Sequence, residues 1–143
     1  MKEMIERLKK AGKKLELKPG ASQSLIDLSE TVLNRVIPDD YVQWLRISNG
    51  CEFISSGTIF YGLNTGSKYS SLEYHNSAAF RSNYSLPDDL MIIGKMSFGD
   101  LICIDAENGN IVQWDHENDE EFDYWETLMD YLDFECKSDF SDE

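Results

Sequence analysis

Three short apolar segments, separated only by brief polar turns, constrain the fold of this chain more than any other feature. They run from Met91 to Met96, from Leu101 to Asp105 and from Asn110 to Trp114. The turn before the third segment ends in Asn108-Gly109, a pair that favours the tight turn of a hairpin. Parallel strands need a much longer crossover than these turns provide. The sequence therefore predicts three antiparallel neighbours in one sheet.

The middle segment is apolar at every position from Leu101 to Ile104. A strand that faces water on one side would alternate apolar and polar residues, so this pattern indicates a central strand buried on both faces, with helices over one of them. Two further short strands are expected at Cys51–Ile54 and Thr58–Tyr61, around a Ser-Ser-Gly turn.

Helical spacing dominates the first third of the chain. It predicts an amphipathic helix over residues 2–12. A second helix is expected after Ser22 or Ser24, either of which can cap it, with Leu25, Leu28 and Val32 as its core-facing side. A third helix opens at Ile37-Pro38-Asp39-Asp40 and ends at Asn49-Gly50.

The remaining segments complete the predicted fold. Residues 64–71 read as a loop, residues 72–81 as a short helix, and residues 137–143 as a frayed acidic tail. The last helix is expected from Phe122 to Phe134, with one apolar stripe. That stripe contains Phe122, Trp125, Leu128, Met129 and Leu132. We predict a single α+β domain over residues 1–143, with its core at about 22–135 and helices packed around an antiparallel sheet.

The charge is strongly negative and unevenly distributed. The net charge is −14; residues 1–20 hold seven basic and three acidic residues, whereas residues 115–143 hold thirteen acidic residues and one lysine. Such a field repels nucleic acid and anionic membranes and attracts a basic protein, so direct binding to nucleic acid or membranes is not expected. Solubility alone is an alternative reason for the acidity. Asp133 and Glu135, near the end of the predicted helix, are expected to cost stability through the helix dipole.

The N-terminus interleaves charged and apolar residues, where a signal peptide would have an unbroken apolar stretch. The longest apolar runs are far shorter than a membrane span. Three widely spaced cysteines, Cys51, Cys103 and Cys136, fit reduced thiols better than a disulfide framework. These features predict a cytoplasmic protein.

Motifs for catalysis or metal binding are few. The sequence has no Gly-rich phosphate loop, no HExxH and no CxxC. The two histidines, His75 and His116, lack a second metal ligand at a recognised spacing, apart from the acidic run near His116. Acids at residues 115, 117, 119, 123 and 126 have the spacing of a calcium loop, but Glu120 stands where that loop needs glycine. We therefore expect no enzymatic activity, no metal and no cofactor.

Several motifs together resemble one known family, the SUKH superfamily of Smi/Knr-like proteins, over roughly residues 22–135. They are Ile-Pro-Asp-Asp-Tyr at 37–41 with Asn49-Gly50, then Gly99-Asp100 before the apolar strand that ends at Asp105, and then Val112 with Trp114-Asp115-His116-Glu117. The resemblance implies an α+β domain with an antiparallel sheet and no catalytic residues. It also implies that bacterial members are commonly immunity proteins that neutralise secreted toxins, often nucleases.

Two functions follow from the charge and the resemblance. The first is an immunity protein that covers the basic cleft of a toxin, expected to be a nuclease, with an acidic face. The residues expected to bind this partner are Asp115, Glu117, Asp119, Glu120 and Glu121, with Tyr124 as an aromatic anchor. The second is a regulatory or scaffold adaptor that binds a housekeeping protein.

Overall fold

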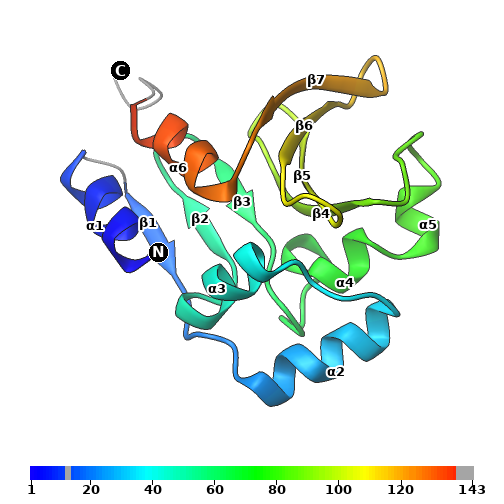
Figure 1. Ribbon diagram of the computed structural model, residues 1–143, viewed down its shortest axis with the longest axis horizontal. Coiled ribbons are helices and arrows are strands. Elements are labelled where there is room, and N and C mark those ends of the chain that lie inside the picture. Colours follow the sequence, from blue (N-terminus) through cyan, green and yellow to red (C-terminus); the bar gives the residue numbers. More distant parts are fainter. Residues whose placement is uncertain (12–13, 138–143) are drawn as a thin grey trace.

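The structure is a computed structural model that describes residues 1–11 and 14–137 (Figure 1). Its centre is one antiparallel sheet of seven strands, and their order in space is their order along the chain. The strands are β1 Leu15–Leu17, β2 Cys51–Phe53, β3 Thr58–Phe60, β4 Leu90–Lys95, β5 Leu101–Asp105, β6 Ile111–Asp115 and β7 Glu120–Trp125.

The described residues also form six α-helices and one turn of 3₁₀-helix. The α-helices are α1 Lys2–Lys10, α2 Gln23–Leu33, α3 Asp39–Ile47, α4 Leu72–His75, α5 Ala78–Arg81 and α6 Leu128–Lys137; the 3₁₀ turn is η1 Lys68–Ser70. The predicted α+β class, with helices around an antiparallel sheet, is confirmed. None of the described helices is long and apolar enough to cross a bilayer.

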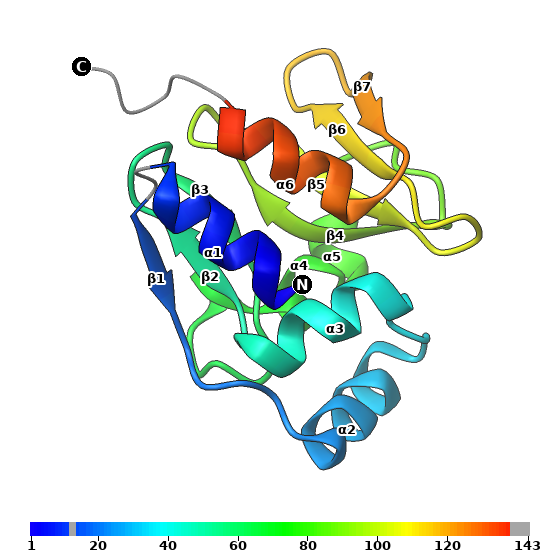
Figure 2. The ribbon, with the colours of Figure 1, turned by 60° about the vertical axis from the view of Figure 1, so that its left-hand side comes forward.

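Phe60 of β3 is the centre of the main aromatic cluster. Its ring lies 5.7 Å from Trp44 and 6.4 Å from Tyr41, both on α3, and 6.0 Å from Tyr131 on α6. Ring pairs at these separations add to the free energy gained by burial. Since α3 and α6 both reach Phe60, they cover the same face of the sheet, and α1 lies beside α6 (Figure 2).

The central strand is buried as predicted. All four residues from Leu101 to Ile104 are at most 1% exposed, and β4, β5 and β6 pair antiparallel in sequence order. Burying a run of this kind contributes ~1.5–3 kcal/mol for each large side chain. This strand is therefore the rigid support for the strands that follow it.

Residues of α4, of α5 and of the turn between them bind the part of β4 that β3 does not pair. β3 pairs with β4 only at Gly94 and Lys95. Beyond them, the Asn76 side chain donates to the Ile92 carbonyl and accepts its N–H, each at 2.8 Å, and Arg81 donates to the Leu90 carbonyl at 2.6 Å. These bonds satisfy backbone groups that a strand would otherwise pair. The expected single helix over 72–81 is thus two helices that meet at Asn76.

The prediction of a helix from Phe122 to Phe134 is wrong in its first part. Residues 120–125 form strand β7, and α6 begins only at Leu128. Phe122 is 67% exposed and does not belong to the core stripe. The aromatic residues at 122, 124 and 125 are a β-favouring set, and pairing with β6 decides the outcome.

The predicted face of α2 is wrong at Leu28 and Val32, although Leu25 does pack against the core, and one strand was not predicted. α2 buries Ile26 and Ser29, whereas Leu28 and Val32 are 56% and 64% exposed. The first helix ends at Lys10, and β1 follows where no strand was expected. Of the expected acidic tail, residues 138–143 lie outside the described residues.

Candidate protein-binding surface

β6 and β7 form a hairpin with a dense run of acidic residues. From Asp115 to Glu126 there are seven acids and no lysine or arginine. We call residues 111–126 the acidic hairpin. β7 is the last strand of the sheet and pairs only with β6 among the described strands, so the hairpin lies at the sheet edge, away from α1 (Figure 1).

The two strands of the acidic hairpin differ in burial. Ile111, Val112 and Trp114 of β6 are buried, while residues 120–124 of β7 are all exposed. Trp125 anchors the end of β7, since its ring meets Tyr131 edge-on at 4.8 Å. The structure therefore supports β7 from one side and presents its side chains to solvent.

Asp115 shapes the turn between the strands. One carboxylate oxygen accepts the N–H groups of Glu117 and Asn118 at 2.8 and 3.0 Å, and the other accepts the Asn118 side-chain amide at 3.0 Å. The backbone hydrogen bonds from Asn118 and Glu117 lower the pKa of Asp115, because they favour the charged form. Asp115 thus holds the turn in addition to contributing charge.

Asp119 ties the turn to the body of the protein. Its carboxylate accepts the Ser85 N–H at 2.9 Å and the Trp114 indole N–H at 3.0 Å. These hydrogen bonds, those from Ser85 first, lower the pKa of Asp119. The residue has a φ of 56°, a left-handed conformation that aspartate tolerates better than most side chains. It therefore has a structural role at this position.

The other predicted residues are not engaged in this way. Glu117, Glu120 and Glu121 are exposed, and within the described part of the chain none of their carboxylates makes a hydrogen bond or ion pair. Tyr124 is 54% exposed and lines a shallow pocket of about 260 Å³ together with Glu121. The structure thus places three carboxylates without a hydrogen bond or ion pair to a described residue, and one exposed aromatic ring, on one hairpin.

The family model described as SMI1 / KNR4 family (SUKH-1) matches residues 20–133. The chain belongs to the SMI1 / KNR4 family. This confirms the resemblance found in the sequence. The SUKH family is known as a family of the immunity-protein type and is not a known enzyme family.

Among solved structures, the SMI1 / KNR4 chain is similar to a protein described as "Crystal structure of protein from Pseudomonas syringae pv. tomato". The TM-score is 0.71 at 16% sequence identity, and the match covers 93% of this chain and 96% of the other. At this identity the likeness shows the fold alone. No curated protein matches the chain.

One cluster of this SMI1 / KNR4 chain could offer ligands to a metal. Side-chain atoms of Asp100, Asp115 and His116 lie within 4.8 Å of one another. Asp100 already accepts from the Gln113 amide at 2.8 Å and from the His116 ring at 2.6 Å. The hydrogen bond that His116 donates to Asp100 raises the pKa of His116. These hydrogen bonds attach the hairpin to the start of β5.

The calcium-loop spacing noted in the sequence is not realised as a loop followed by a helix. Residues 116–119 form a turn between β6 and β7, and residues 120–125 continue as a strand. The acids at 123 and 126 therefore lie along β7 and just beyond it, and not in a loop like that of an EF-hand. One carboxylate oxygen of Asp123 instead accepts the N–H of Tyr124 at 2.8 Å.

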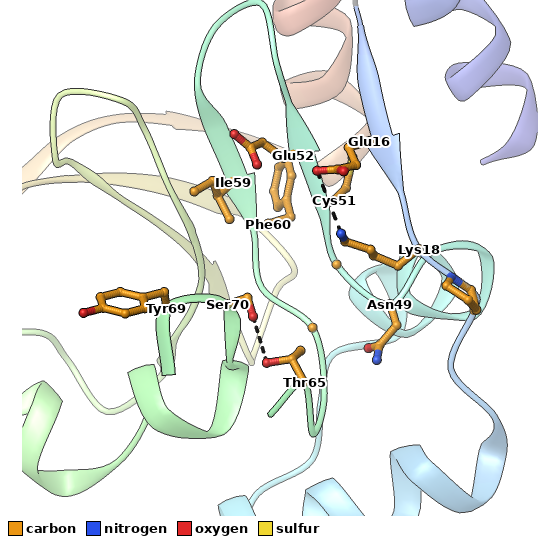
Figure 3. Close-up of a pocket in the computed structure, with 14 residues that line it drawn as sticks. Glu16, Lys18, Asn49, Cys51, Glu52, Ile59, Phe60, Thr65, Tyr69 and Ser70 are labelled. Carbon is orange, nitrogen blue, oxygen red and sulfur yellow. Dashed lines mark hydrogen bonds and ion pairs between the residues drawn. The ribbon is translucent and has the colours of Figure 1, made fainter. Parts of the chain in front are cut away.

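The pocket in Figure 3 has a volume of about 620 Å³ and lies beside β1, β2 and β3. Lys18 and Glu16 at its rim form an ion pair at 3.8 Å, and Ser70 donates to Thr65 at 2.8 Å. Burial raises the pKa of the Cys51 thiol to about 12, so the thiol is protonated at neutral pH and is not an activated nucleophile.

Sequence reasoning placed Phe122 in the core and so missed it as a surface residue. The alternation of aromatic and acidic residues from Glu121 to Tyr124 is a signal for a strand, because side chains of a strand alternate between two faces. It does not signal the exposure of Phe122, which lies where the β6–β7 register is irregular. Phe122 and Tyr124 together give the acidic hairpin two exposed aromatic rings.

Proposed function

We propose that this protein is a cytoplasmic immunity protein that binds and neutralises a cognate secreted bacterial toxin, a nuclease, through the acidic hairpin. One observation carries the proposal. Glu117, Glu120 and Glu121 are exposed on an edge hairpin without lysine or arginine, and within the described part of the chain their carboxylates make no hydrogen bond or ion pair.

A nuclease must hold phosphate, so its cleft is basic. An acidic face accelerates association with such a cleft and lines up the two surfaces. Phe122 and Tyr124 supply apolar area next to the charges, in the manner of interface anchors. The mechanism is steric and electrostatic: the hairpin covers the cleft and excludes the nucleic acid, and no bond is made or broken.

The test is co-expression with the toxin domain encoded by the neighbouring gene, with cell growth as the first readout. Growth should be rescued by the wild-type chain. The association rate of the purified pair, measured by stopped flow at low salt, should fall by about 100-fold in Glu120→Lys/Glu121→Lys.

The matched control is Glu6→Lys/Glu52→Lys, which changes the net charge equally on α1 and β2. This control should associate almost as fast as the wild type. Equal slowing of both variants would show that only overall charge matters and would overturn the role of the hairpin. Absence of rescue, together with capture of a housekeeping protein, would favour the regulatory or scaffold adaptor.

A further inference from the structure

A further pocket is lined by basic residues and not by acidic ones, in contrast to the acidic hairpin. It has a volume of about 350 Å³ and lies between η1, α4 and the adjoining ends of β4 and β5. Its lining consists of six tyrosine, phenylalanine or histidine rings, two lysines, one glycine and one leucine. No aspartate or glutamate lines it, although the chain has 27 acidic residues.

The two lysines, Lys68 and Lys95, are the only lysines between residues 19 and 136. Both are exposed, and neither makes an ion pair with another described residue. The Lys68 ammonium group lies 5.6 Å from the centre of the Tyr69 ring. Two ammonium groups at one small pocket, with no carboxylate in its lining, favour a negatively charged ligand.

The rings form a preorganised apolar wall. His75 and Tyr61 are buried and stack with centroids 3.9 Å apart and planes 7° from parallel. Phe80 meets His75 edge-on at 4.7 Å. His75 donates from Nδ1 to the Ser71 carbonyl at 2.7 Å, which fixes the orientation of the imidazole. Such a wall accepts a flat ring by stacking or edge contact.

We propose that this pocket binds a small ligand made of a flat ring with an attached anionic group. The ring contacts the wall formed by Tyr61, His75 and Phe80, and the anion lies between Lys68 and Lys95. The volume is at the lower end of the range for small-molecule sites, which fits a ligand with a single ring system. An aryl carboxylate and a nucleoside monophosphate share this chemistry.

Isothermal titration calorimetry on the full chain distinguishes an aryl carboxylate from a nucleoside monophosphate as the ligand. The probes are 4-hydroxybenzoate with its neutral amide, and uridine monophosphate with uridine. At least one anionic probe should bind in the submillimolar range, and its neutral counterpart should bind about tenfold more weakly. The anionic probe with the higher affinity identifies the source.

Substitutions locate the binding. Lys68→Gln and Lys95→Gln should each lower the affinity for the anionic probe about tenfold. Because both side chains are exposed, the variants should fold. Lys18→Gln, at the pocket of Figure 3, is the matched control and should leave affinity unchanged. Failure of all probes to bind at millimolar concentration, or unchanged affinity in Lys68→Gln/Lys95→Gln, would overturn the proposal and leave the role of the acidic hairpin untouched.

Discussion

Acidic residues serve opposite purposes in α6 and in the acidic hairpin. On α6, Asp133 bridges Arg7 of α1 and Lys137, the latter at 3.0 Å. Glu135 is 1% exposed and accepts hydrogen bonds from Thr58 at 3.0 Å and Tyr131 at 2.8 Å. In the hairpin, by contrast, the carboxylates of three exposed glutamates make no hydrogen bond or ion pair with the described residues. Acidic composition alone therefore does not identify a binding face; the deciding property is whether the fold already uses the charge.

The acids at the end of α6 also differ from what their position in the helix suggests. Asp133 and Glu135 were expected to cost stability near the end of a helix. Ion pairs and buried hydrogen bonds offset that cost, and they attach α6 to α1 and to β3. The hydrogen bonds that Asp133 accepts from Lys137 and Arg7 lower its pKa, in that order of effect.

The largest expected difference between the two regions is in stability. Glu135→Ala leaves the buried hydroxyls of Thr58 and Tyr131 without this acceptor, so the free energy of unfolding should fall by about 2 kcal/mol. Urea denaturation measures this. Glu121→Ala in the hairpin should change the same quantity by less than about 0.5 kcal/mol. Equal losses in the two variants would abolish the distinction between the regions.

Within the hairpin, Asp119 should behave like an acid of α6. Asp119→Ala removes the acceptor of the Ser85 N–H and the Trp114 indole N–H, so Tm should fall by a few degrees in a thermal melt. Glu120→Ala, one residue away, should leave Tm nearly unchanged. A similar Tm for both variants would show that the bonds of Asp119 do not hold the turn.

The His116–Asp100 pair should give the hairpin a modest dependence on pH. Because the folded pKa of His116 is raised above 6.5, its contribution to stability is complete below 6.5 and is lost as pH rises through the folded pKa. Tm should therefore fall slightly more in the wild type than in His116→Gln between about pH 6 and about pH 8. Parallel pH profiles of the two proteins would contradict this role.

The smallest expected effect is a rise in Tm, where the other variants lower it or leave it unchanged. Glu120 lies directly across from Asp115 in the β6–β7 register, and like charges opposite each other repel. Glu120→Lys should raise Tm by about a degree while it slows capture of a basic partner. A lower Tm in this variant would mean that the exposed charge stabilises the hairpin.

Much of the fold was predictable because its strongest patterns are local. The apolar run at 101–104 and its short turns identify the antiparallel centre. Of the two predicted candidates for the cap of α2, Ser22 is the one that caps it, accepting the Leu25 N–H at 3.2 Å. The errors occur where tertiary contacts decide. Ser29 of α2 is buried because it donates to Glu73 at 2.8 Å, and no periodicity of apolar residues can reveal such a polar contact.

The candidate surface was predictable in composition but not in form. The acids of residues 115–121 are evident in the sequence, yet a helix was expected from Phe122 because Phe122, Trp125 and Leu128 also fit helical spacing. The sequence also does not reveal which carboxylates accept hydrogen bonds within the fold, since the donor to Asp119 is the N–H of Ser85, far away along the chain. The choice of these residues for partner binding stays a prediction.

β7 is also an open sheet edge, and its charge has a consequence for self-association. Unpaired edges invite a second chain to add a strand, which leads to aggregation. Here two copies of β7 would place Glu120, Glu121 and Asp123 against the same acids, and the Asp123 carboxylate already occupies the Tyr124 N–H. Repulsion between these carboxylates therefore disfavours pairing of β7 with a second copy of itself.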